Sequence, residues 1–307
     1  MAVFVVRRMG GAVVTFLVAT VVIFTLTFAL PGDPARVIAG RKASEATLAA
    51  IRAKYHLDQS LPTQYARWVG RLLRGDLGES IVSRRAVVSI LRDALPVTMT
   101  LMAATVLIEL VLGAGLGVLV GMRRGGALDR AVVVLCVLGI ASPLFVLASL
   151  AQYLFGVRWG LLPVAGVDDG LIGYVLPSMV LATIGGSFAV RLMRVETLDQ
   201  LNLPHVRTAR SKGISERQLT RNHVARNAMT ALVTFFGLEI GALLGGTVVV
   251  ERVFNLAGVG GVLGRAISQR DNVVIIGFTV FVVVVYLALD VLIDVVTMLL
   301  DPRTRVS

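Results

Sequence analysis

The sequence predicts an all-α membrane protein that crosses the bilayer several times. Of its 307 residues, 56% are hydrophobic and only 16% are charged, and the mean hydropathy is +0.83. A soluble domain of this size could not cover so much apolar surface. The apolar residues also gather in runs as long as a spanning helix, with charged residues, Gly and Pro between them.

Six apolar runs have the length of about 20 residues that a spanning helix needs. They cover residues 9–30, 97–122, 131–155, 174–193, 229–251 and 273–300. The first run follows Arg7 and Arg8, as the apolar part of a signal peptide would. It is longer than the roughly 7–15 residues of a signal h-region, however, and no small-x-small cleavage site ends it. We therefore expect a retained anchor helix.

Basic residues predict the orientation in the membrane. If the six runs alternate, the basic short connections all lie on one side, which the positive-inside rule assigns to the cytoplasm. Both termini then lie in the cytoplasm. These basic residues are Arg7, Arg8, Arg123, Arg124, Arg130, Arg303, Arg305 and the loop that starts at Arg194. Residues 31–96 are also basic but exceed the length of about 60 residues over which the rule operates.

The runs divide the chain into three parts. Residues 1–30 form an N-terminal anchor helix, residues 31–96 a small extracytoplasmic helical segment, and residues 97–307 a five-helix core with a cytoplasmic loop at 194–228. In the extracytoplasmic segment, Ser44 can cap a helix that places Leu48 and Ile51 on one face. The stretch GDLGES, residues 75–80, reads as a turn-rich link back to the membrane.

Two sets of glycines recur every four residues and leave one helix face without side chains. Gly113, Gly117 and Gly121 lie in the second run, and Gly237, Gly241 and Gly245 lie in the fifth. We expect these faces to serve close helix packing. The sharper alternative is that they let helices slide or rock between two states.

Four acidic residues, Glu109, Glu239, Asp290 and Asp294, lie in or near the membrane runs. A spacing of four places Asp290 and Asp294 on one helical face, which should point into the bundle or a wet cavity. Asp294 is near the cytoplasmic end and can pair with an Arg of the basic loop. Glu239 and Asp290 are candidates for a pathway or gating role, and structural pairing or interfacial placement is the alternative.

The sequence offers little catalytic chemistry. His56, His205 and His223 fall on different segments and have no metal-ligand spacing to one another or to the single cysteine, Cys136. No phosphate-binding Gly-x-x-x-x-Gly-Lys-Ser/Thr loop and no nucleophile–base pair is present. We expect neither an enzyme nor a bound metal or cofactor. The net charge is +11, and the charged residues flank the apolar runs. This distribution indicates a role in membrane topology and contact with lipid, and it argues against a nucleic-acid partner.

A basic polar loop, VRTARSKGISERQLTRNHVARNA at residues 206–228, separates the fourth and fifth runs. Gly213 can adopt the left-handed conformation that ends a helix, and Ser215 can cap a second helix. A basic helix could also lie on anionic headgroups. That position needs a broad apolar face, which Ala209, Ile214 and Leu219 do not provide, so we favour docking into a protein cleft.

This loop closely resembles the cytoplasmic EAA loop of permease subunits of ATP-binding-cassette (ABC) importers, in the B-type permease of the dipeptide, oligopeptide and nickel importer family. The resemblance extends over nearly the whole chain. It includes GDLGES at residues 75–80, GLLPVAG at 160–166, GALLGGTVVVERVFNLAGVG at 241–260 and LLDPRTR at 299–305. These motifs are specific for the family but not for its substrate.

The resemblance implies the type I ABC importer permease fold and a coupling role for the loop. Thr208, Ala209 and Arg210 occupy the Glu-Ala-Ala-like positions, and Gly213 the family's glycine. With Arg207, Lys212 and Ile214 they form the segment that would enter a groove on a cytoplasmic ATPase subunit.

The implied partners are a second homologous permease, which favours a heterodimer, two cytoplasmic ATP-binding subunits that hold ATP and Mg, and an extracytoplasmic substrate-binding protein. The chain would form half of a peptide translocation pathway in the cell inner membrane. Two alternatives stay open: an ABC permease for nickel or another small solute, and an ion-coupled secondary transporter that uses Glu239 and Asp290.

Overall fold

The computed structural model describes residues 2–29, 35, 43–54 and 58–300, and helices dominate these ranges. The α-helices are α1 (Ala2–Ala29), α3 (Glu45–Lys54), α4 (Leu61–Leu72), α5 (Val87–Leu112), α6 (Val118–Met122), α7 (Ala127–Ala141), α8 (Leu144–Ala151), α9 (Val175–Leu201), α10 (Pro204–Ser211), α11 (Glu216–Leu219), α12 (Arg226–Val253), α13 (Val259–Gln269) and α14 (Asn272–Leu300). Shorter helical turns of other pitch are η1 (Gly113–Gly117), η2 (Gln152–Arg158), η3 (Gly170–Tyr174) and η4 (Thr220–Ala225).

By length and composition, the described helices include four candidate membrane spans, or six when each of two bent pairs counts as one span. The first bent pair, α7 with α8 and η2, turns through 109°. The bend falls at Ser142 and Pro143, within the run 131–155 that the sequence presents as continuous. Proline disfavours helical geometry at the residue before it, and Ser142 has φ −85° and ψ 133°. The second pair bends by 53° within α12.

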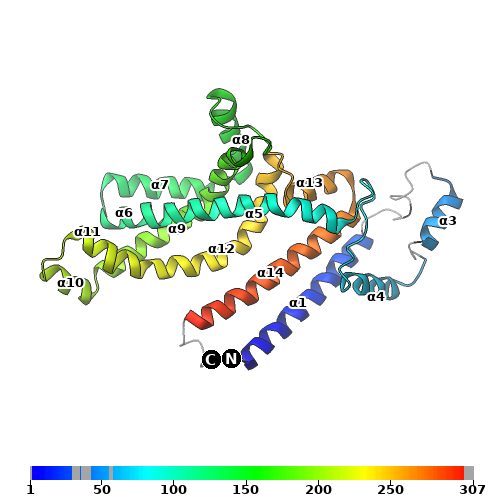
Figure 1. The fold of residues 1–307 in the computed structure, drawn as a ribbon, viewed down its shortest axis with the longest axis horizontal. Helices are drawn as coiled ribbons and strands as arrows, with labels where there is room; N and C mark the ends of the chain where they lie inside the picture. The colour runs from blue at the N-terminus through cyan, green and yellow to red at the C-terminus, as the bar shows by residue number, and fades with distance from the viewer. Residues whose placement is uncertain (1, 30–34, 36–42, 55–57, 301–307) are drawn as a thin grey trace. The chain divides into compact units, whose positions relative to one another are not determined.

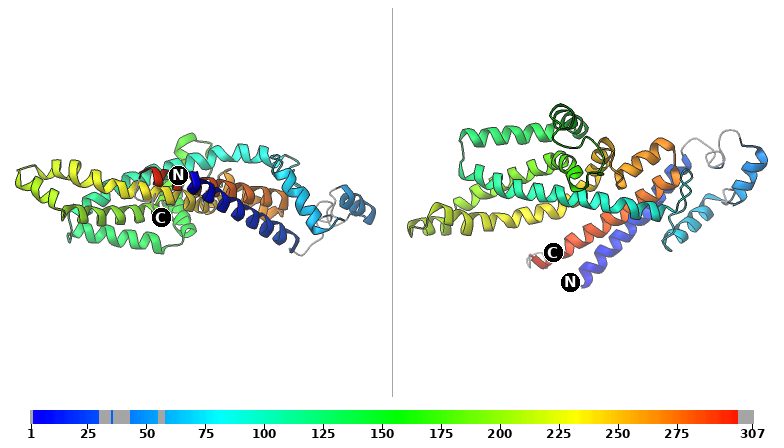
Figure 2. Two further views of the ribbon diagram at one scale, coloured as in Figure 1. Left: turned by 90° about the horizontal axis from the view of Figure 1, so that it is seen from below. Right: turned by 45° about the horizontal axis from the view of Figure 1, so that its top comes forward.

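Two compact units make up the chain: Met1–Ala94 with Val262–Ser307, and Leu95–Gly261. In the first unit, α1 and α14 lie side by side and run in opposite directions (Figure 1 and Figure 2). A guanidinium nitrogen of Arg8 lies 3.1 Å from a carboxylate oxygen of Asp290 and ties the two helices together.

Helix α4 rests on α1 through aromatic side chains. The Tyr65 ring lies 5.4 Å from the ring of Phe24, and its hydroxyl is 3.0 Å from the hydroxyl of Thr20. Trp68 also approaches Phe24, with ring centroids 5.8 Å apart. These aromatic side chains therefore pack α4 against α1.

The GDLGES turn is held by one buried carboxylate at the start of α14. Asp271 accepts a hydrogen bond of 2.6 Å from the Ser80 hydroxyl, and the amides of Ile81, Val82 and Val274 donate to it at 3.3, 3.3 and 3.4 Å. Gly78 has φ +89°, a conformation that favours glycine. The predicted turn is confirmed, and these bonds fix where it meets α14.

In the second unit, α5, α7, α9 and α12 form a helical bundle (Figure 1). Its largest core includes Leu101, Leu181, Leu243 and Phe254, all nearly inaccessible to solvent. Nε and Nη2 of Arg194 on α9 donate to the two carboxylate oxygens of Asp129 on α7, at 2.6 and 2.9 Å, and this bidentate pair links the two helices.

One of the two glycine faces lies close against α9. A Cβ added to Gly113, Gly117 or Gly121 would come within 2.9 Å of Ala189, 2.5 Å of Met193 or 2.7 Å of Thr197, which recur every four residues on α9. These three glycines allow α5, η1 and α6 to approach α9 closely. Gly245 of the second set differs, because nothing lies within 4 Å of its added Cβ; the neighbouring Gly246 faces Leu181 instead.

Candidate coupling loop and buried carboxylates

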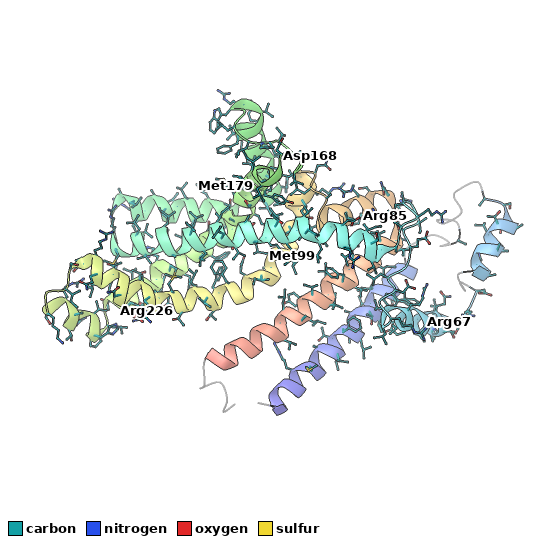
Figure 3. All side chains as sticks on the ribbon, viewed as in Figure 1. Arg67, Arg85, Met99, Asp168, Met179 and Arg226 are labelled. Carbon is teal, nitrogen blue, oxygen red and sulfur yellow. The ribbon has the colours of Figure 1, made fainter. Side chains whose placement is uncertain are left out.

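The segment between α9 and α12 forms a helix, a break and a second helix, as the sequence predicts. Pro204 opens α10, where its missing N–H has no intrahelical partner to lose. The helix ends at Ser211, Lys212 follows it as the C-cap, and Gly213 has φ +78°. Ser215 then caps α11 by accepting a hydrogen bond from the amide of Gln218 at 3.4 Å. Figure 3 shows Arg226, where α12 begins, near the same end of the bundle as α10 and α11.

This segment has a small apolar core of its own. Val206, Ala209, Leu219 and Val224 are buried together. Leu201 and Ile214 pack partly buried against them. Ala209 and Ile214, which the sequence places in the coupling segment, therefore face the interior of the loop and shape it.

The other predicted coupling residues lie on the outside of the loop. Arg207, Thr208, Arg210, Lys212 and Gly213 are exposed. A partner that meets α10 would touch this basic and polar face, while Ala209 would act from beneath it.

An ion pair bridges the break between α10 and α11. Nε and Nη2 of Arg210 donate to the two carboxylate oxygens of Glu216, at 2.7 and 3.2 Å. This pair lowers the pKa of Glu216 and raises the pKa of Arg210 relative to their ordinary values. Both side chains are about half exposed, so the pair orients the two helices more than it stabilises them.

The candidate pathway acids occupy different settings. Asp290 pairs with Arg8, as described above. Glu239, on α12, is half-buried beside Gly185 of α9 and near Glu109 of α5. The side chain of Asp294 lies outside the described residues, as do the side chains of His223 and Arg221.

Sequence reasoning missed a buried carboxylate at the end of α12. Glu251 is fully buried and accepts hydrogen bonds from the Thr98 hydroxyl at 2.6 Å and the Gly261 amide at 2.8 Å. The Thr98 oxygen in turn accepts from the amide of Val259 at 2.8 Å, which is the first residue of α13. A Cβ on Gly258 would overlap the Glu251 carboxylate. Gly258 and Gly261, which follow Glu251 in the sequence, were the signal that could have indicated a closely packed group here.

Among the described residues, no three His, Cys, Asp or Glu side chains gather closely enough to hold a metal ion. Cys136 is buried within α7. The polar features that the described residues do form are ion pairs and buried carboxylates.

Comparison with known proteins places the chain in a family. Residues 113–306 match the family described as binding-protein-dependent transport system inner membrane component, and residues 1–102 match the N-terminal domain of such membrane components. The chain is 35% identical over 302 residues to the glutathione transport system permease protein GsiC of Salmonella paratyphi A, which covers 98% of each chain.

Two further relatives agree. The GsiC protein of Pectobacterium atrosepticum is 34% identical over 98% of each chain. A Brucella abortus (strain 2308) protein, provisionally named as a peptide transport system permease, is 35% identical over 99% of each chain. The length of these matches and the helical, multi-span fold show that this chain belongs to the inner membrane components of binding-protein-dependent transport systems, with the type I ABC importer permease fold.

Proposed function

We propose that this chain is one transmembrane permease subunit of an ATP-driven importer for peptides and peptide-like solutes such as glutathione. The observation that carries the proposal is the match over almost the whole chain to permeases named for glutathione and peptide transport. The same names favour peptides over nickel or another small solute. The chain supplies half of the route, and a second, homologous permease supplies the other half.

The energy for transport comes from two cytoplasmic subunits that bind ATP and Mg and hydrolyse the ATP. The permease itself carries out no reaction. The exposed face of α10, formed by Arg207, Thr208, Arg210 and Lys212, enters a groove on the ATPase. A rigid loop transmits movement better than a mobile one, and the loop's own core and the Arg210–Glu216 pair supply that rigidity.

The proposal puts this loop and both termini in the cytoplasm, which the basic connections support, and residues 31–96 on the outer side, where the substrate-binding protein delivers cargo. Closure of the ATPases then moves the bundle from an inward-open to an outward-open state. An ion-coupled transporter would need no such loop.

Uptake by proteoliposomes tests the proposal. The complete complex should accumulate peptide only with ATP, and the double change Arg207→Glu with Lys212→Glu should lower uptake at least tenfold, because it reverses charge on a docking surface. Arg158→Glu is the matched control, because Arg158 is an exposed arginine on η2 outside the loop. Equal uptake by the loop variant and the control would contradict the docking role, and uptake without any ATPase subunit would contradict the whole proposal.

A crosslinking experiment locates the contact. Cys136 is the only cysteine in the chain, so Cys136→Ala gives a permease chain without thiols. In this background Thr208→Cys should crosslink to the ATPase and Ser149→Cys, on α8, should not.

A further inference from the structure

Two carboxyl groups from different helices converge on one glycine inside the second unit. Glu109 lies on α5, Glu239 on α12 and Gly185 on α9. A Cβ built on Gly185 would overlap an oxygen of Glu109 and would lie 2.6 Å from Oε1 of Glu239. Both oxygens therefore border the same point, and only glycine leaves room for them at position 185.

Glu109 has no partner for its charge among the described residues. Its side chain is fully buried, and neither of its carboxylate oxygens accepts or donates a hydrogen bond there. Glu239, which is half-buried, adds a second negative charge close by. Two ionised carboxylates in such a place repel each other and lack the water that would solvate them. A positive group from outside the chain would remove both penalties.

The geometry selects among positive groups. A divalent metal takes six or more oxygen ligands, or a cluster of His, Cys and carboxylates. Among the residues that the structure describes, no third such side chain joins the pair. A primary ammonium group has three N–H donors on one small head, and two carboxylates present four acceptor oxygens. The pair therefore fits a single monovalent head group better than a metal.

We propose that Glu109 and Glu239 form a binding site for one primary ammonium group, and that in the working transporter this group is the amino end of the cargo. The inference rests on the proposed function, because a peptide or glutathione carries a free ammonium. Glu239 is the more accessible carboxyl group of the site, and Glu109 is the more deeply buried one. Between cargo molecules, a proton on one of the two carboxyls removes their repulsion.

Neighbouring glycines provide a matched pair of variants. Gly185→Ala would place a methyl group where the carboxyl oxygens lie. Gly186→Ala meets only ordinary contacts, 3.6 Å from Leu112 and 3.8 Å from Glu109. Both changes add the same atom to the same helix, so a difference between them reports on the carboxyl pair.

The first experiment measures the site without any peptide. A hydrophobic carbodiimide couples to protonated buried carboxyls, and mass spectrometry of the purified complex reads the labelling of Glu109 and Glu239. Methylammonium, which has three N–H donors, should lower this labelling at least tenfold, whereas tetramethylammonium, which has none, should leave it unchanged. Gly185→Ala should abolish the protection and Gly186→Ala should keep it. Equal labelling with and without methylammonium would overturn the proposal and leave the proton as the only occupant.

The second experiment brings in the cargo. Proteoliposomes with the complete transporter take up a tripeptide with a free amino end and the same tripeptide with an acetylated amino end. The binding protein is the same in every sample, so a change in the ratio of the two rates between variants arises in the permease. Glu109→Gln and Glu239→Gln should lower the ratio about tenfold, since each replaces an ion pair with the ammonium group by a hydrogen bond to a neutral amide.

The outcomes separate the two proposals. If wild-type complex carries no peptide, the proposed function fails, and the methylammonium experiment still tests the site. If wild-type uptake is normal and the ratio is unchanged in both Gln variants, the carboxyls do not hold the cargo. Loss of the second permease from the Gln variants on size-exclusion chromatography would instead show that a basic side chain of that subunit is the occupant, which also overturns the proposal.

Discussion

The Thr98 hydroxyl donates a hydrogen bond of 2.6 Å to the Glu251 carboxylate, and both side chains are buried. The residues lie 153 positions apart in the sequence and on different helices, α5 and α12. Because the Thr98 oxygen also accepts from the amide of Val259, one hydroxyl joins the end of α12 to the start of α13. The chain between these helices is thereby held in one conformation.

Thr98→Val should destabilise the protein, because it removes one hydrogen bond from the buried Glu251 carboxylate and takes away the hydroxyl oxygen that accepts from the Val259 amide. We expect a loss of about 1.5–3 kcal/mol in the free energy of unfolding, the usual value for a hydrogen bond to a charged group. Thermal unfolding of the purified protein in detergent measures it. Asp169→Asn, a change at an exposed carboxylate, is the control and should unfold at the wild-type temperature. Equal melting temperatures for Thr98→Val and the control would show that the bond contributes nothing.

Gly117 and Gly115 allow a sharp test of helix packing, because both lie in the single turn η1. A Cβ at Gly117 would lie 2.5 Å from that of Met193, whereas a Cβ at Gly115 meets nothing within 4 Å. Gly117→Ala should therefore destabilise the protein by about 1–3 kcal/mol through overpacking. Gly115→Ala should be neutral or stabilising, since alanine forms helix better than glycine by about 1 kcal/mol. Thermal unfolding of the two variants decides, and a reversed order of their melting temperatures would contradict the packing against α9.

The Arg210–Glu216 pair should hold the break in the coupling loop in a pH-dependent way. Because the pair lowers the pKa of Glu216, its contribution is present above the ordinary carboxyl pKa and disappears as the pH falls through the lowered value. Amide hydrogen exchange of residues 206–219, corrected for the intrinsic rate, should become faster over that acidic range. Glu216→Gln should show the fast exchange at every pH. The double change Arg210→Glu with Glu216→Arg should restore slow exchange near neutral pH; fast exchange in this charge-swapped variant would show that the pair does not order the loop.

Arg8 and Asp290 should behave as a coupled pair. Removing one partner, in Arg8→Gln or Asp290→Asn, breaks the ion pair between the packed helices α1 and α14 and should lower the stability of the protein. Removing both charges together should cost less than either single change. The yield of monodisperse protein on fluorescence-detected size-exclusion chromatography measures this. Strictly additive losses would favour the alternative role of Asp290 in the pathway or in gating.

Much of this fold could be read from local patterns. Apolar runs give the helices because each span must satisfy its own backbone hydrogen bonds in lipid. Gly213 and Ser215 predict where α10 ends and α11 begins, because a positive φ and an N-terminal cap are requirements of single positions. The spacing of Gly113, Gly117 and Gly121 predicts one smooth face, and in the structure a Cβ on any of the three would meet α9.

Other features could not be predicted, because they depend on which helices meet. Spacing by four made Gly245 look equivalent to Gly117, yet nothing faces it within 4 Å. The run 131–155 read as one straight span, although Pro143 could have signalled the bend of 109°. The resemblance puts Ala209 in the docking segment, and local patterns did not show that its side chain is buried within the loop.

The sequence by itself determined the class of protein, the number of apolar runs and the position of the basic loop, since these follow from composition and from short-range geometry. Only the tertiary structure decided which carboxylates gain partners. Asp290 meets Arg8, Asp271 meets Ser80 and Glu251 meets Thr98, whereas Glu109 lies near a second acid and has no hydrogen-bond partner in the described part of the chain. The reason is physical: the free energy of a buried charge depends on the groups that folding brings within a few ångströms of it, and those groups come from distant parts of the chain.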